Sequence, residues 1–174
     1  MKPIKKTKNR IRALNNSPSI EIDINIDDDR WNNDFDPKIE KTIFVALNEL
    51  NAQIIQPIEI SILLSNDEKQ QQLNLKWRNK DKSTNVLSFP QIAPFAPLSG
   101  LLGDISFAYE TIISECEQLN IEFEQHFTHL LVHGFLHLLG YDHQNERSAK
   151  IMEDKEIKIL KLLGIGNPYN SGKT

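Results

Sequence analysis

The chain of 174 residues contains one cysteine, Cys116, and has no long apolar segment. A single cysteine excludes an intramolecular disulfide and is compatible with a reducing compartment, so we expect a cytoplasmic protein. The apolar stretch at 127–139 is too short for a membrane span and contains three histidines, so we expect no membrane association. No apolar stretch follows the basic N-terminus, which argues against a secretory signal.

The net charge of −4 conceals a strong asymmetry along the chain. Residues 1–12 carry six basic side chains and no acid, so the remaining chain is clearly acidic. We predict that residues 1–18 form a disordered basic arm, which either keeps the chain soluble or contacts nucleic-acid phosphates. Because the body is acidic, any nucleic-acid site on it would have to be a local basic groove.

The hydrophobic pattern predicts a single α+β domain over residues 19–165, followed by a flexible tail at 166–174. Alternating or short apolar runs predict a small mixed sheet of about four strands, at 19–26, 58–64, 85–89 and 102–107. Helical spacing and capping residues predict helices at 37–51, 65–77, 109–119, 122–140 and 147–163. The helix at 122–140 carries the histidines and is apolar almost all round, so we expect it to be central.

The most informative motif is HGFLHLLGYDH at 133–143, with histidines at i, i+4 and i+10. On a helix, His133 and His137 lie on one face at a separation that suits two ligands of one tetrahedral ion. Gly140 can adopt the left-handed conformation that ends a helix, so the chain can turn back and offer His143 as a third ligand. Three imidazoles bind zinc and leave a fourth position open. We therefore expect one Zn²⁺ ion and a metal-dependent hydrolase.

The residues around this motif have more than one interpretation. The spacing equals the metzincin pattern H-E-x-x-H-x-x-G-x-x-H, but Gly134 stands where those proteases carry their general-base glutamate. This weakens, without removing, the alternative of a zinc metallopeptidase-like hydrolase. We expect His126 and His129 in core packing or in hydrogen bonds behind the ligands. Asp142 either orients a histidine or the bound water, or caps the turn of its own loop.

A second cluster concentrates cations in the segment WRNKDKSTNVLSFP at 77–90. The planar guanidinium of Arg78 offers paired donors that match a phosphate, and Lys80 and Lys82 add point charges. These three side chains are candidate RNA-binding residues. The alternative for the lysines is an exposed ion pair, for instance with Asp81.

Taken together, these segments resemble the YbeY family, the bacterial zinc-dependent endoribonucleases implicated in ribosomal RNA maturation. The matching segments are WRNKDKSTNVLSFP at 77–90, GDISF at 103–107 and HLLVHGFLHLLGYDH at 129–143, and the resemblance spans about residues 20–163. The chain departs from the family at Ser83, where proline is more usual. Its basic arm is also longer than the family leads us to expect.

The resemblance implies a single-strand-specific, metal-dependent endoribonuclease, with His133, His137 and His143 on zinc and Arg78 as an arginine important for activity. It also implies a role at the 3′ end of small-subunit ribosomal RNA and in ribosome quality control. The implied partners are ribosomal RNA, ribosomal subunits and ribosome-associated proteins. A non-catalytic ribosome-assembly factor whose zinc only stabilises the fold is the remaining alternative.

Overall fold

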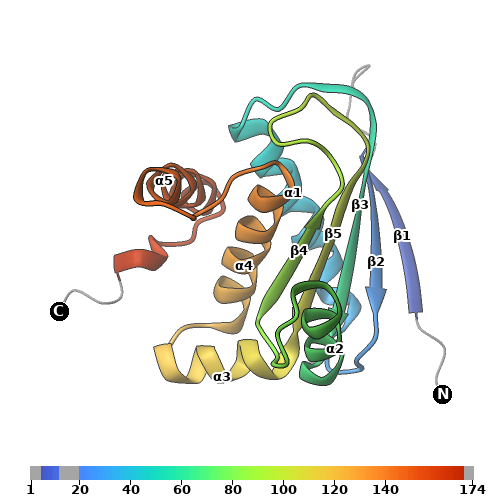
Figure 1. Cartoon of the computed structure of the whole chain (residues 1–174), viewed down its shortest axis with the longest axis vertical. Helices are drawn as coiled ribbons and strands as arrows, with labels where there is room; N and C mark the ends of the chain where they lie inside the picture. Colours follow the sequence, from blue (N-terminus) through green and yellow to red (C-terminus); the bar gives the residue numbers. More distant parts are fainter. Residues whose placement is uncertain (1–4, 12–19, 171–174) are drawn as a thin grey trace.

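The computed structural model describes residues 5–11 and 20–170. A mixed sheet of five strands, in the order β1-β2-β3-β5-β4, forms its framework (Figure 1). The strands are β1 Lys5–Ile11, β2 Ile20–Ile26, β3 Ile54–Ser65, β4 Val86–Pro90 and β5 Leu98–Ala108. The helices are α1 Asp36–Glu49, α2 Asp67–Arg78, α3 Tyr109–Leu119, α4 Phe123–Leu138 and α5 Glu146–Leu162, with short 3-10 turns at Asn33–Phe35 and Pro168–Asn170.

One face of this sheet builds the hydrophobic core. Every second residue of β2 is a buried isoleucine, namely Ile20, Ile22, Ile24 and Ile26, and the residues between them are half-buried. β3 repeats this alternation from Ile58 to Leu64. Because β-branched side chains pack well on a pleated surface, the alternation fixes which face turns inward.

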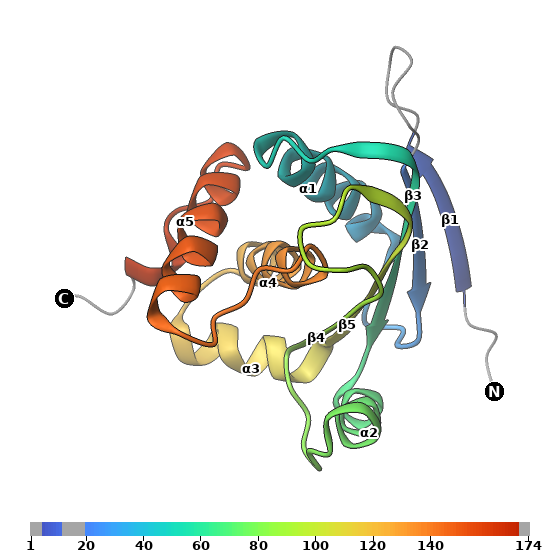
Figure 2. The ribbon, with the colours of Figure 1, turned by 45° about the horizontal axis from the view of Figure 1, so that its top comes forward.

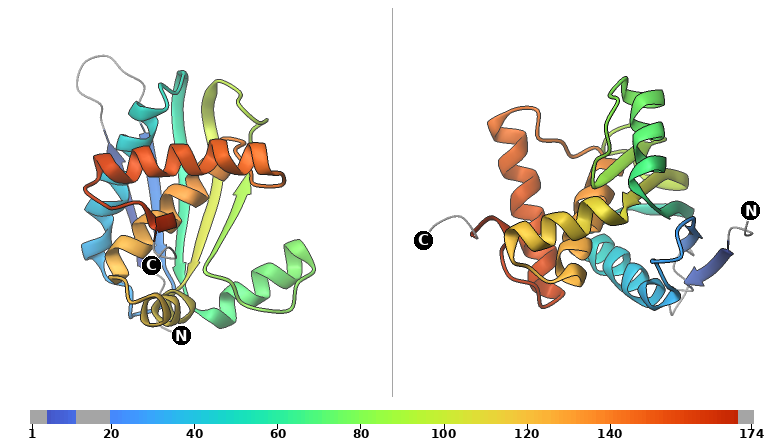
Figure 3. Two further views of the ribbon diagram at one scale, coloured as in Figure 1. Left: turned by 90° about the vertical axis from the view of Figure 1, so that its left-hand side faces the viewer. Right: turned by 90° about the horizontal axis from the view of Figure 1, so that it is seen from below.

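Helix α4 lies at the centre of the molecule, as predicted from its apolar surface. Figure 2 shows it nearly end-on, enclosed by the sheet, α1, α3 and α5. Its residues Phe127, Leu131 and Phe135 are fully buried. Helix α2 lies on the opposite face of the sheet, against β5 (Figure 3). There the Gln70 side chain and Ser106 exchange two hydrogen bonds, of 3.0 and 2.8 Å.

The prediction of one α+β domain with a mixed sheet and a central histidine-bearing helix is confirmed. All four predicted strands and all five predicted helices are present, although β5 begins at Leu98 rather than at residue 102. The described part of the chain includes no helix that is both long enough and apolar enough to cross a membrane.

The structure differs from the predicted disordered arm at residues 5–11, which form strand β1 antiparallel to β2. The segment KKTKNRI lacks apolar alternation, so hydrophobic pattern alone does not indicate a strand. Its backbone register places residue 8 opposite residue 23 and residue 10 opposite residue 21. Residues 1–4 and 12–18 of the arm, and 171–174 of the tail, lie outside the described residues.

Candidate metal centre

The end of α4 positions the histidine motif. Gly140 has φ +102°, in the region that disfavours side chains, and follows Leu139, the C-cap residue of α4. Its N–H donates to His137 O and the N–H of Tyr141 donates to Leu136 O, both at 3.1 Å, which is the hydrogen-bond pattern of a Schellman motif. The predicted glycine-ended helix is therefore confirmed, and the chain reverses toward His143.

The three histidine rings of the motif come together at this reversal. One ring nitrogen each of His133, His137 and His143 lies within 4.8 Å of the others. The Nε2 atoms of His133 and His137 are 3.1 Å apart, close to the roughly 3.3 Å that separates two nitrogen ligands of one tetrahedral zinc ion. The sequence prediction that the third histidine joins the first two agrees with this geometry.

Hydrogen bonds on the far side of two rings fix which nitrogens face the centre. Glu156 Oε1 accepts from His133 Nδ1 at 2.7 Å, and the carbonyl oxygen of Tyr141 accepts from His137 Nδ1 at 2.9 Å. A neutral imidazole that donates through Nδ1 keeps an unshared electron pair on Nε2. Two such electron pairs directed at each other call for a cation between them, so the donor set fits a metal ion.

The electrostatics of His137 agree with a ligand that is ready to bind. Burial lowers the pKa of His137 to about 4, and the neighbouring His133 and His143 rings act in the same direction. The ring is therefore neutral at pH 7, which is the protonation state that a metal ligand requires.

Glu156 of α5 is the residue of this site that sequence reasoning missed. Its carboxylate is fully buried and accepts hydrogen bonds from His129 and His133 of α4 and from the hydroxyl of Tyr169. Burial raises the pKa of Glu156, but these hydrogen bonds outweigh burial and lower it to about 2. A signal exists in the sequence, because Glu156 lies on the buried stripe of α5 with Met152, Ile159 and Leu160.

We expect the substitution Glu156→Gln to weaken metal binding by about 10–100-fold, the usual effect of losing the partner that orients a histidine ligand. Glutamine keeps the size but replaces one acceptor oxygen by a donor, which opposes the ring N–H of His129 or His133. Competition with a chromophoric chelator measures the affinity. Glu153→Gln, an exposed position on the same helix, is the matched control. Equal metal affinity of both variants would contradict this role for Glu156.

Gly134, which replaces the metzincin glutamate, is a close-packing position. A Cβ atom here would lie 2.9 Å from Ile105 Cγ2 and 3.1 Å from Ser88 Oγ. Ser88 Oγ also donates to the carbonyl oxygen of Gly134 at 3.0 Å, which ties α4 to β4. Close packing therefore explains the glycine at this position, and the site has no acid where metzincins carry their general base.

We expect Gly134→Ala to reduce the free energy of unfolding by about 1–2 kcal/mol. Overpacking costs about 1–3 kcal/mol, because Ile105 is fully buried, and the better helix propensity of alanine recovers up to about 1 kcal/mol. Urea unfolding measures the change. Gly166→Ala, where an added Cβ meets open space, serves as the control. If Gly134→Ala were as stable as the parent, the packing argument would be wrong.

Arg78 lies against the edge strand β4. It is the last residue of α2, it is exposed, and its Nη2 donates to the carbonyl oxygen of Ser88 at 3.2 Å. The hydroxyl of Ser88 also donates a hydrogen bond to the carbonyl oxygen of Gly134, the residue after His133. Ser88 of β4 therefore contacts both Arg78 and helix α4. The positive charge of Arg78 contributes to the lowered pKa of His137, which places the guanidinium within electrostatic range of the histidines.

The remaining predicted residues have surface or structural positions. Lys80 and Lys82 are exposed in the loop that follows α2. The carboxylate of Asp142 accepts from the backbone N–H of Gln144 at 3.1 Å, which agrees with the cap of its own loop. His126 hydrogen-bonds Glu115 at 2.7 Å, which agrees with a structural role for this histidine.

Comparison with known proteins gives consistent matches over most of the chain. A family model described as Endoribonuclease YbeY matches residues 23–164. The chain is 39% identical to an Endoribonuclease YbeY of Agrobacterium fabrum, over 87% of this chain and 95% of that protein. It is 43% identical to an Endoribonuclease YbeY of Bartonella quintana, over 86% of this chain and 97% of that protein.

A solved structure gives independent support for the fold. A Thermotoga maritima protein, whose structure was determined in solution, superposes with a TM-score of 0.57 and 23% sequence identity. The match covers 89% of this chain and 96% of the other. At this identity, the likeness is evidence for the fold alone.

Proposed function

The chain belongs to the YbeY endoribonuclease family, and we propose that it is a metal-dependent, single-strand-specific endoribonuclease that acts in ribosomal RNA maturation. One observation carries the proposal for this site. The Nε2 atoms of His133 and His137 converge, the ring of His143 joins them, and hydrogen bonds to Glu156 and Tyr141 hold the first two rings in place.

We propose zinc as the ion, bound by His133, His137 and His143. Three neutral imidazoles suit the tetrahedral preference and the borderline-soft character of Zn²⁺, and they leave one coordination position for another ligand. When bound, the ion supplies a Lewis acid that polarises a phosphoryl oxygen and lowers the pKa of water. The hydrogen bonds to Glu156 and to the carbonyl oxygen of Tyr141 keep the rings of His133 and His137 oriented toward the ion.

Arg78 is the proposed catalytic residue. A guanidinium has five N–H donors in a planar fork, so the hydrogen bond to Ser88 O leaves donors for the non-bridging oxygens of a phosphate. Its charge stabilises the additional negative charge that develops in the transition state of phosphodiester hydrolysis. The exposed Lys80 and Lys82 then hold neighbouring phosphates of the RNA backbone.

The half-buried position of His133 and His137, beside the exposed His143, favours a single-stranded substrate. His133 and His137 are only partly exposed, so a phosphodiester must approach them closely. A flexible single strand can bend one phosphate into such a site, whereas a duplex holds its phosphates on a stiff helical surface. This argument supports single-strand specificity.

We further propose that the RNA is ribosomal, with the 3′ end of the small-subunit RNA as the maturation site and ribosome quality control as a second role. Ribosomal subunits and ribosome-associated proteins in the cytoplasm are then the partners. The basis is family membership, since the segments at 77–90 and 129–143 carry the motifs by which the chain resembles these RNA-maturing enzymes.

RNA cleavage by the purified full-length chain tests the proposal. We expect cleavage of a single-stranded precursor of the small-subunit RNA 3′ end, little cleavage of the same sequence in a duplex, loss of activity with a chelator and recovery with zinc. A casein or peptide substrate is the control for a peptidase. Cleavage of peptide without RNA would overturn the proposal, and a zinc-loaded chain without turnover would favour the assembly factor.

A further inference from the structure

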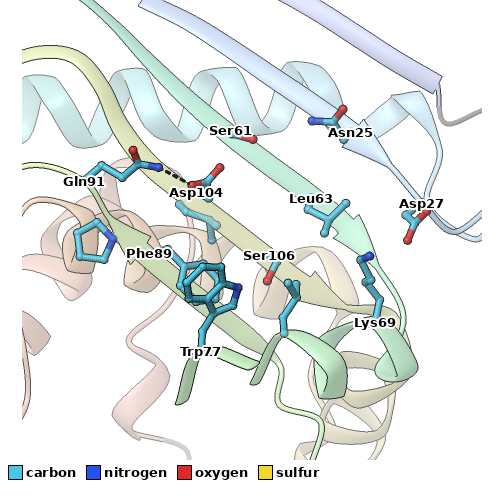
Figure 4. A pocket seen from close by; sticks show the side chains of 13 residues that line it. Asn25, Asp27, Ser61, Leu63, Lys69, Trp77, Phe89, Gln91, Asp104 and Ser106 are labelled. Carbon is cyan, nitrogen blue, oxygen red and sulfur yellow. Dashed lines mark hydrogen bonds between the residues drawn. The ribbon is translucent and has the colours of Figure 1, made fainter. Parts of the chain in front are cut away.

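A groove lies on the face of the sheet that the core does not use, between α2 and strands β2 to β5. We call it the sheet groove; Figure 4 shows the side chains that line it. Its volume is about 540 Å³, and its apolar surface comes from Leu63, Leu73, Phe89 and the ring of Trp77. Trp77 is one of two tryptophans in the chain, and 62% of its surface is exposed to solvent, which is unusual for so large an apolar side chain. The three histidines of the metal centre do not line the groove.

The rim of the sheet groove carries hydrogen-bonding groups rather than a cluster of cations. It includes the side chains of Asn25, Asp27, Lys69, Gln91 and Asp104. Gln91 donates to Asp104 Oδ2 at 2.9 Å, and both side chains face the groove (Figure 4). Two carboxylates against one ammonium make the rim unfavourable for a phosphate. An apolar floor with amides and carboxylates around it instead suits an uncharged, flat group with polar edges.

The sheet groove continues to the proposed catalytic arginine through Phe89. The ring of Trp77 lies edge-on to Phe89 with centroids 6.4 Å apart, and Arg78 Cζ lies 6.0 Å from the centroid of the same ring. Neighbouring residues of α2 thus flank one aromatic ring, with the indole on the groove side and the guanidinium hydrogen-bonded to the backbone of β4. A cationic group therefore lies next to an apolar subsite, as a phosphate lies next to a base in RNA.

We propose that the sheet groove binds one unpaired base of the RNA, stacked on Trp77, while Arg78 holds the adjacent phosphate. The inference rests on the proposed function, because it takes the RNA phosphate at Arg78 as its starting point. Base–aromatic stacking is the common mode by which proteins bind single strands. The carboxylates of Asp27 and Asp104 on the rim offer acceptor oxygens to the polar edge of such a base.

The test compares Trp77→Ala and Trp77→Phe with Leu75→Ala, which removes an exposed apolar side chain of the same helix that does not line the groove. The probes are single-stranded RNA oligonucleotides with one abasic nucleotide moved stepwise past the cleaved bond. Affinity is measured by fluorescence anisotropy with chelator-treated full-length protein, and KM and kcat are measured with the zinc-loaded protein. Circular dichroism verifies that each variant is folded.

We expect Trp77→Ala to raise Kd and KM by about 5–100-fold with little change in kcat, Trp77→Phe to recover most of the loss, and Leu75→Ala to behave as the parent. We also expect one position in the RNA at which an abasic nucleotide weakens binding to the parent protein. At that position the missing base has no further effect on binding to Trp77→Ala, because both changes remove the same contact. If, at every position of the abasic nucleotide, its loss of affinity multiplied with the loss caused by Trp77→Ala, the inference would be overturned.

The outcomes separate this inference from the proposed function. If the parent cleaves RNA in an Arg78-dependent manner while Trp77→Ala binds and cleaves RNA equally well, only the groove inference fails. If the parent neither binds nor cleaves RNA, the proposed function fails first.

Discussion

Replacing His137 by alanine will leave the purified protein with little or no bound metal and will reduce RNA cleavage to background. The ring shares the metal centre with His133, 3.1 Å away, and its orientation is fixed by the carbonyl oxygen of Tyr141. Loss of a direct ligand should exceed the about 100-fold upper range for loss of an outer hydrogen-bond partner. Metal analysis after gel filtration and a cleavage assay with zinc in limited supply measure both effects.

The matched control for this variant is His126→Gln. His126 lies on the same helix, but its ring is hydrogen-bonded to Glu115 and does not belong to the cluster of three histidines. Its replacement should therefore leave the metal content unchanged. Stoichiometric metal and normal cleavage in His137→Ala would show that the histidine cluster has no part in the chemistry.

Replacing Arg78 by alanine will reduce kcat/KM for RNA cleavage by about 10²–10³-fold while the metal content stays that of the parent. This is the usual effect of removing one group that stabilises charge in a transition state. Arg78 is exposed and its hydrogen bond to Ser88 O lies at the edge of the sheet, so we expect little change in the free energy of unfolding.

Two further variants make the result for Arg78 specific. Arg78→Lys should recover only part of the activity, because an ammonium keeps the charge but lacks the paired donors of the guanidinium. Arg147→Ala, at an exposed arginine in the first turn of α5, removes the same charge elsewhere and should cleave as the parent does. If Arg78→Ala cleaves normally and retains its metal, the catalytic role proposed for this residue is wrong.

The metal motif could be predicted from the sequence because its geometry is local. His133 and His137 are one helical turn apart, and Gly140 determines the reversal that returns His143. The same holds for the buried strands, whose alternation of isoleucines fixes the inward face. Helix periodicity and turn chemistry suffice for such features, since they depend on residues that are close along the chain.

The supporting residues could not be placed in the same way because they come from distant segments. Glu156 contacts His133 only because α5 packs against α4, although its position on an apolar stripe was a usable signal. The reason for glycine at 134 becomes visible only when α4 is packed against Ile105 and Ser88. Strand β1 was missed because the segment KKTKNRI has no apolar alternation, and its backbone pairing with β2 is not visible in a hydrophobic pattern.

The central claim is that three imidazoles share one cation, and metal analysis combined with X-ray absorption spectroscopy of the purified full-length protein tests it most directly. The account predicts one metal ion per chain, with the signature of three imidazole nitrogens at about 2.0–2.1 Å, and loss of that signature in His143→Ala. A protein that takes up no metal, or one whose spectrum is the same without His143, would contradict the account.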